Sequence, residues 1–219
     1  RVSILSNNDN HKGEGQGHVH AHPDSPCWSC RGSVDQRAPF CHACGIIQPA
    51  RRGDEFQRLG MKADFDLDPK DLEKRYFAFQ RTFHPDRFAT KSSREKQLSL
   101  QHATDLNEAY DRLKAPLSRA EALLETKGAG VDDHARTESD PELLMEAMES
   151  REALADAETA DEVAKLEALT RADIELSEEA LSLAFSADDL EGATGIVTRL
   201  KYLLKLLQEI RRKRLVLNN

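Results

Sequence analysis

Pro85 separates two stretches whose apolar residues recur at the spacing of an α-helix. The first stretch covers residues 69–83 and the second covers residues 92–113. Because proline cannot continue a helix and pushes the preceding residue towards extended geometry, the two helices must reverse direction at this point. The sequence therefore predicts a helical hairpin whose tip carries His84 and Asp86 on either side of the proline.

The residues that begin the two helices support this interpretation. Asp68 can cap the first helix with Pro69 in its first turn, and Ser92 with Glu95 forms the pattern of a capping box. A polar tip on such a hairpin is typical of a surface offered to a partner, although an ordinary turn between solvated basic helices is the alternative interpretation.

Composition places the rest of the chain in the all-α class. Residues 54–219 are rich in Leu, Ala, Glu, Lys and Arg and poor in β-branched residues, which is typical of helical bundles. Three further helical patterns cover residues 141–158, 161–186 and 188–217, and their short connections predict an antiparallel three-helix bundle. No apolar run approaches the roughly 18 residues that a membrane span needs.

Charge is distributed unevenly along this bundle. Residues 140–191 hold 17 acidic and 3 basic residues, whereas residues 192–219 hold 7 basic residues and one acidic residue. The last helix can therefore partly neutralise the two before it. A chain with a net charge of −8 is a poor surface for nucleic acid, because that binding depends on neutralising phosphates.

All four cysteines lie in two Cys-x-x-Cys pairs near the N-terminus, at Cys27, Cys30, Cys41 and Cys44. This spacing predicts a tetrahedral site for structural zinc, in which Gly32 and Gly45 would suit the tight turn after each pair. Two disulfides, a redox pair and iron–sulfur ligation are the competing interpretations. Four thiolates leave no open position, so a catalytic zinc site is not expected.

The hairpin resembles the J-domain, by which DnaJ-type co-chaperones stimulate the ATPase of DnaK-class chaperones. The resemblance rests on residues 54–60 as a first short helix, on the two hairpin helices, and on the sequence Asn-Glu-Ala-Tyr at 107–110. It implies that His84, Pro85 and Asp86 form the activating loop. Chaperone binding is implied for the residues His84, Pro85, Asp86, Arg87, Lys70, Lys74, Arg75 and Arg81.

The C-terminal helices narrow the resemblance to the HscB family, whose members deliver an IscU-type iron–sulfur scaffold protein to the chaperone HscA. The likeness covers residues 54–217 and is carried by residues 143–154 and 200–203. Leu143, Leu144 and Met145 are consecutive, so one helix face cannot bury all three. The resemblance implies scaffold binding by Leu144, Met145, Met148, Glu149, Glu152, Asp156 and Tyr202, of which Met148, Asp156 and Tyr202 differ from the Leu, Glu and Phe of the best-known bacterial pattern.

Taken together, these features predict five segments and a non-enzymatic role. The segments are a disordered tail at 1–25, a four-cysteine zinc unit at 26–50, a J-domain at 52–126, a linker at 127–139 and a scaffold-binding three-helix bundle at 140–219. The alternatives are a generic DnaJ-like co-chaperone and a zinc-knuckle nucleic-acid-binding protein. An enzyme using His84 and Asp86 is disfavoured, since no nucleophile or phosphate loop accompanies them. No membrane partner is expected. Without a visible signal core we expect the bacterial cytoplasm, with the mitochondrial matrix as the alternative.

Overall fold

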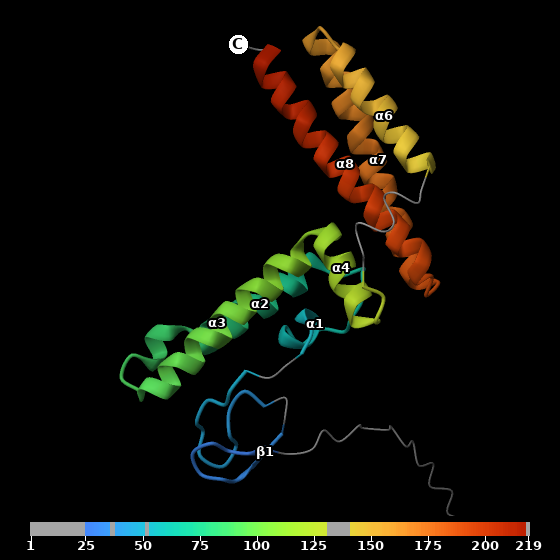
Figure 1. Cartoon of the computed structure of the whole chain (residues 1–219). Coiled ribbons are helices and arrows are strands. Elements are labelled where there is room, and N and C mark those ends of the chain that lie inside the picture. The colour runs from blue at the N-terminus through green and yellow to red at the C-terminus, as the bar shows by residue number, and fades with distance from the viewer. Residues whose placement is uncertain (1–24, 36–37, 51–52, 131–140, 218–219) are drawn as a thin grey trace, which may run out of the picture. The chain divides into compact units, whose positions relative to one another are not determined.

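The computed structural model describes residues 25–35, 38–50, 53–130 and 141–217. It divides the chain into two compact units, residues 1–48 and 49–219 (Figure 1). The predicted tail lies outside the described residues except for Ser25, and so does most of the predicted linker. Among the described residues, no helix is long and apolar enough to cross a membrane.

The first unit consists of two short β-hairpins built around the cysteine pairs. Strand β1 (Ser25–Pro26) pairs antiparallel with β2 (Ser33–Val34), and a single antiparallel bridge joins Phe40 to Ile47. Val34 is fully buried beside two of the cysteines, and half-buried alanine and isoleucine side chains pack around them. So small an apolar core cannot stabilise a fold of this size by itself, which makes the sulfur cluster the main structural feature of the unit.

The second unit begins with the predicted hairpin and its flanking helices, whose bounds are α1 (Glu55–Arg58), α2 (Pro69–Phe83), the 3₁₀ turn η1 (Pro85–Phe88), α3 (Ser93–Lys114) and α4 (Pro116–Thr126). Helices α2 and α3 lie side by side (Figure 1). Ser92 and Glu95 form the predicted capping box, and the Asp68 side chain accepts a hydrogen bond from the Lys70 amide. These caps satisfy amide groups that the helix itself leaves unpaired, so each helix begins where the sequence predicts.

Three longer helices complete this unit: α6 (Pro141–Asp156), α7 (Ala160–Ser186) and α8 (Leu190–Leu217). Helices α7 and α8 pack against each other along their lengths (Figure 1). Glu167, whose side chain is 7% exposed, lies on α7 between Arg171 of the same helix and Arg214 of α8. The predicted pairing of acidic and basic helices is seen at this buried carboxylate and at Glu146 of α6, which pairs with Arg199 of α8.

A smaller apolar cluster joins α6, α7 and α8, and the main apolar core of the second unit joins the hairpin to α7 and α8. The main core contains Leu72 and Leu113 from the hairpin helices and Val197 and Leu200 from α8. Phe65, in the loop before α2, stacks on Phe185 of α7 with ring centroids 5.4 Å apart. The chain is thus mostly helical as predicted, and the hairpin and the three-helix bundle share their core.

Candidate functional site: the hairpin tip, the α6 surface and the cysteine cluster

The tip of the α2–α3 hairpin exposes all three of its central residues, His84, Pro85 and Asp86. The His84 side chain is 52% exposed and the Asp86 side chain is 90% exposed. His84 Nδ1 accepts a hydrogen bond from the Asp86 amide at 3.3 Å, which makes His84 the cap of η1. The Asp86 carboxylate therefore projects into solvent from a backbone that His84 holds in place.

Side chains of α3 and of the loop itself hold the base of this loop against the end of α2. The Ser99 hydroxyl, which is buried, donates to the carbonyl of Phe83 at 2.7 Å and so ties the end of α2 to α3. Phe88 of η1 is also buried. Arg87 donates to the Arg81 carbonyl at 3.2 Å, which closes the loop over the last turn of α2. These contacts tie the tip to the ends of α2 and α3.

The basic residues of α2 do not form a single surface. Lys70, Lys74 and Arg81 are exposed and lie within about 60° of one another around the helix axis. Arg75 lies at least about 100° away from them. Its guanidinium donates to Asp71 at 2.7 Å and to the Gly60 carbonyl at 2.6 Å, so Arg75 braces the loop after α1.

Sequence reasoning missed an aromatic residue within this basic stripe. Phe77, which is 44% exposed, shares the helix face of Lys74 and Arg81. Phe77 lies three residues after Lys74 and four before Arg81, and this spacing could have placed it on their helix face from the sequence alone. An exposed phenylalanine between cations offers apolar contact area to a partner. The charges alone would mainly orient that partner as it approaches.

Helix α6 exposes the apolar side chains that the sequence placed beyond its buried face. Leu144, Met145 and Met148 are 51%, 63% and 65% exposed, whereas Leu143 is buried. This confirms that one face cannot cover three consecutive large side chains. The acidic members of the predicted set, Glu149, Glu152 and Asp156, are exposed, and all six residues lie within about 140° of one another around the axis.

Tyr202 differs from the other members of that predicted set. It belongs to α8, is half-buried, and its hydroxyl donates to the Ala147 carbonyl of α6 at 3.1 Å. The guanidinium of Arg151 lies over the Tyr202 ring at 6.0 Å from its centroid. Burial raises the pKa of the Tyr202 phenol. Tyr202 thus lies under α6, with the Arg151 guanidinium over its ring.

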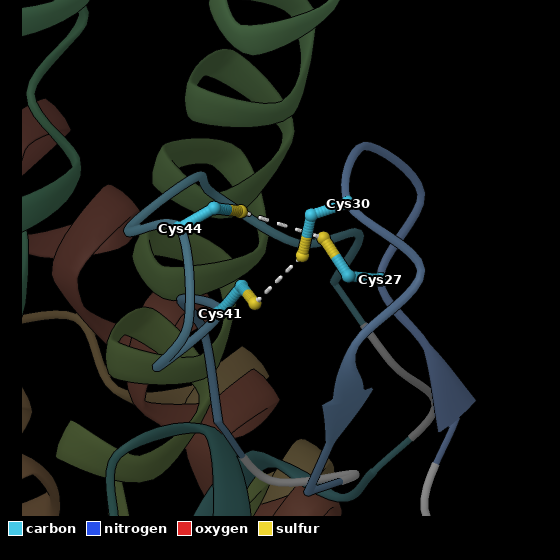
Figure 2. Close-up of side chains that lie close together, drawn as sticks. All are labelled: Cys27, Cys30, Cys41 and Cys44. Atoms are coloured by element: carbon cyan, nitrogen blue, oxygen red, sulfur yellow. Dashed lines mark hydrogen bonds between the residues drawn. The ribbon is translucent and has the colours of Figure 1, made fainter.

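The four cysteine sulfurs converge from the two β-hairpins of the first unit (Figure 2). All four Sγ atoms lie within 4.8 Å of one another, and the pairs Cys27–Cys44 and Cys30–Cys41 are 3.8 and 3.7 Å apart. A tetrahedral ion with Zn–S bonds of about 2.3 Å requires sulfurs about 3.8 Å apart. The thiols are free rather than disulfide-bonded. The donor set therefore fits a metal ion.

The two cysteine turns share a backbone pattern. The amide of Arg31 donates to the Cys27 carbonyl at 3.1 Å, and the amide of Gly45 donates to the Cys41 carbonyl at 2.7 Å. Arg31 and Gly45 both adopt positive φ, at 67° and 70°. The predicted role of Gly32 in the first turn is therefore wrong. The residue directly after the second cysteine adopts the left-handed conformation, and in the first turn that residue is an arginine.

The environment of the cluster prepares one thiol for deprotonation. Burial raises the pKa of Cys27, but hydrogen bonds from the amides of Cys30 and Ser29 and from the Gln48 side chain outweigh it and bring that pKa to about 6. The amide of Ile46 lowers the pKa of Cys44, yet burial and the neighbouring thiols raise it to about 12. A bound cation would favour the thiolate form of every member.

Comparison with known proteins identifies the family. A family model described as the HSCB C-terminal oligomerisation domain matches residues 139–211. The iron-sulfur cluster co-chaperone protein HscB of Homo sapiens is 34% identical over 195 residues, which cover 87% of this chain and 83% of the human protein. The chain belongs to the HscB family.

Further comparisons agree with this assignment. The co-chaperone protein HscB homolog of Pseudoalteromonas atlantica is 40% identical over 162 residues, covering 71% of this chain and 93% of that protein. The crystal structure of human co-chaperone protein HscB superimposes with a TM-score of 0.79 at 34% identity, covering 85% of this chain and 97% of that one.

Membership of the HscB family settles the class of function. Its members are iron–sulfur cluster co-chaperones, so this HscB-family chain is a J-protein co-chaperone and not an enzyme. A co-chaperone acts on a chaperone, so a chaperone is one expected partner. The relatives come from bacteria and from eukaryotes.

Proposed function

We propose that this HscB-family protein couples an IscU-type iron–sulfur scaffold to an HscA or DnaK-class chaperone. The hairpin tip triggers ATP hydrolysis on the chaperone, and the α6 surface holds the scaffold. Hydrolysis then locks the chaperone onto the scaffold so that the cluster can be transferred. The observation that carries this proposal is the simultaneous exposure of two surfaces, the polar tip and the apolar face of α6, on one compact unit.

For the chaperone, the proposed contacts are His84, Pro85, Asp86 and Arg87 at the tip, with Lys70, Lys74, Arg75 and Arg81 on α2. Lys70, Lys74 and Arg81 are free to steer an acidic surface because they are exposed and aligned. Arg75 contributes mainly by bracing the preceding loop, given its two short hydrogen bonds. Phe77 adds an apolar contact at the centre of the stripe.

For the scaffold, the proposed contacts are Leu144, Met145, Met148, Glu149, Glu152 and Asp156, with Tyr202 beside them. Flexible methionine side chains adapt to irregular partner surfaces, and the surrounding carboxylates supply register. An exposed apolar cluster rimmed by charge is typical of a protein-binding site.

Structural zinc is the proposed occupant of the cysteine cluster, bound by Cys27, Cys30, Cys41 and Cys44. The sulfur separations of 3.7 and 3.8 Å support a tetrahedral ion. Bound zinc would supply most of the folding free energy of this small unit. We propose the bacterial cytoplasm as the location, with the mitochondrial matrix as the alternative.

The first test is steady-state ATP hydrolysis by an HscA-type chaperone, with this protein and an IscU-type scaffold added separately and together. We expect synergistic stimulation that His84→Gln abolishes, because the substitution leaves the helices intact but changes the exposed tip. Stimulation without scaffold synergy would indicate a generic co-chaperone. Absence of any stimulation would contradict the proposal.

Scaffold binding has its own test with a matched control. Met148→Ser removes a side chain that is 65% exposed on α6, and Leu176→Ser removes one that is 59% exposed on α7. We expect Met148→Ser to weaken scaffold binding by about tenfold, measured by calorimetry, and Leu176→Ser to leave it unchanged. Equal effects of the two variants would reject the α6 surface as the binding site.

A further inference from the structure

Helix α6 rests on a small apolar base. Its buried residues are Leu143, Ala147 and Leu154, and none of them belongs to the main apolar core of the second unit. The scaffold surface proposed above therefore belongs to a helix that hydrophobic burial attaches only weakly. Other interactions must contribute to its position.

Three side chains of α8 reach across to α6 and bond to it. Arg199 donates to both carboxylate oxygens of Glu146, at 2.6 and 3.0 Å. The Tyr202 hydroxyl donates to the Ala147 carbonyl at 3.1 Å. Lys213 donates to the Leu154 carbonyl and, at 2.8 Å, to the Ala155 carbonyl.

The last of these contacts caps the end of α6. The carbonyls in the final turn of a helix lack partners within the helix, and they carry the negative end of its dipole. An ammonium group bonded to two of them satisfies both requirements. Two of the contacts thus hold α6 near its middle, at Glu146 and Ala147, and the third holds its end.

The three α8 residues share one face of their helix. Arg199, Tyr202 and Lys213 lie within about 60° of one another around the α8 axis. Leu206, which lies between them on the same face, is buried against Leu154. A row of polar bonds around one apolar contact positions α6 more specifically than apolar burial alone, because hydrogen bonds depend on direction.

We propose that Arg199, Tyr202 and Lys213 act as positioning residues, the α8 clamp, which holds α6 so that its outer face is presented to the scaffold. The clamp rests on the proposed scaffold-binding function of α6. Sequence reasoning assigned Tyr202 to scaffold contact and missed Arg199 and Lys213. In the clamp, the hydroxyl of Tyr202 has a role that a phenylalanine at this position could not perform.

The test compares hydrogen–deuterium exchange of the full chain in Arg199→Met, Tyr202→Phe and Lys213→Met. We expect the α6 amides to exchange about 3- to 10-fold faster in each variant, while α7 stays protected, since each lost hydrogen bond shifts the docking equilibrium by about that factor. Arg212→Met and Tyr110→Phe are the matched controls and should exchange like the unaltered protein. The paired substitutions Arg199→Glu and Glu146→Arg should restore protection that Arg199→Glu alone removes.

Two outcomes would overturn the clamp. One is unchanged α6 exchange in all three variants. The other is faster exchange spread evenly over α7 and α8, which would indicate general destabilisation. The exchange experiment needs no scaffold, so it tests the clamp independently of the proposed function. If the unaltered protein fails to bind the scaffold, the proposed function is rejected. The exchange result would still show whether the clamp holds α6.

Scaffold affinity gives a second readout through the triple variant. Three lost contacts of about 3- to 10-fold each leave α6 undocked for much of the time. We expect the triple variant to bind the scaffold at least tenfold more weakly, because only the docked fraction presents the binding face. Full affinity together with fast α6 exchange would show that the scaffold does not require docked α6, and would overturn the positioning role.

Discussion

At the residue scale, two equivalent positions in the cysteine turns need the same left-handed backbone conformation but are occupied by different residue types. Arg31 and Gly45 occupy equivalent positions with φ near +70°. Glycine adopts this conformation freely, whereas a residue with a Cβ atom is strained there. The first turn therefore carries strain that the second does not.

We predict that Arg31→Gly stabilises the cysteine unit by about 1 kcal/mol and that Gly45→Ala destabilises it by about 1 to 2 kcal/mol. A Cβ atom built at Gly45 meets nothing within 4 Å, so the second effect is purely conformational. Chemical denaturation of the zinc-loaded protein, followed by Trp28 fluorescence, measures both. The two substitutions must change the free energy of unfolding in opposite directions. A destabilising Arg31→Gly would contradict the assignment of strain to Arg31.

Gln48 illustrates a second effect at this scale. Its buried amide donates to Cys27 Sγ at 3.3 Å and to the Ile46 carbonyl at 3.0 Å, which joins the second hairpin to the first cysteine pair. Hydrogen bonds of this kind orient a metal ligand and stabilise its thiolate.

We predict that Gln48→Met lowers zinc affinity by about 10- to 100-fold. Competition with a chromophoric chelator measures the affinity, and the thiolate-to-metal band of the cobalt-substituted protein should shift as the sulfur loses its donor. Trp28→Phe serves as the control, because it removes a hydrogen bond to the Ile47 carbonyl without touching sulfur. A cobalt band that shifts equally in both variants would argue against a direct effect of Gln48 on the thiolate.

At the element scale, helix positions were largely predictable and their details were not. The capping residues Asp68 and Ser92 mark helix starts in the sequence, because their side chains bond to amides only a few residues away. Local signals of this kind could not reveal that Arg75 bonds to Gly60 across a loop. Nor could they distinguish a simple turn at Pro85 from the 3₁₀ turn η1, whose geometry depends on the anchoring of Phe88.

Helices α7 and α8 are joined by the carboxylate of Glu167, which gives this pair a pH dependence. Hydrogen bonding to Arg171, assisted by the charges of Arg214 and Arg211, holds the pKa of Glu167 below its ordinary value despite burial. Its stabilising contribution is therefore present above the unfolded-state pKa of about 4.3 and is lost as the pH falls through the lower folded-state pKa.

We predict that Glu167→Gln destabilises the second unit by about 1 to 3 kcal/mol at neutral pH, at the low end for a buried ion pair because its arginines are half-exposed. The difference from the unaltered protein should shrink as the pH falls below about 4. Urea denaturation at pH values from neutral to below about 4 measures this difference in the free energy of unfolding. Glu179→Gln, a substitution at an exposed residue of the same helix, is the control. A difference that is independent of pH would exclude the carboxylate as its cause.

At the scale of the whole molecule, the two compact units contain different kinds of structure. The first holds the cysteines and the chain's single tryptophan, Trp28, and the helices belong to the second. Sequence spacing was sufficient to predict that the four cysteines come together in one cluster, since four ligands of one type in two close pairs leave few alternatives. The shared core of hairpin and bundle was not predictable, because periodicity shows which face a helix buries but not which partner covers it.

We predict that removing zinc with a strong chelator changes Trp28 fluorescence while the far-ultraviolet helical signal and its thermal midpoint stay unchanged. The reason is that ligand binding stabilises the first unit and apolar burial stabilises the second. Circular dichroism and fluorescence on the same sample test this. Loss of helix together with the metal would show that the two units fold cooperatively.

The stacking of Phe65 on Phe185 has a consequence for how two partners would meet. A flexible tether lets its two ends sample a large volume, so the effective concentration of one bound partner near the other is diluted. Here the hairpin and the bundle meet through a common core, and no such dilution applies to them. A partner bound on α6 and a partner bound at the hairpin tip would therefore be held on one compact unit, without the loss of effective concentration that a flexible linker causes.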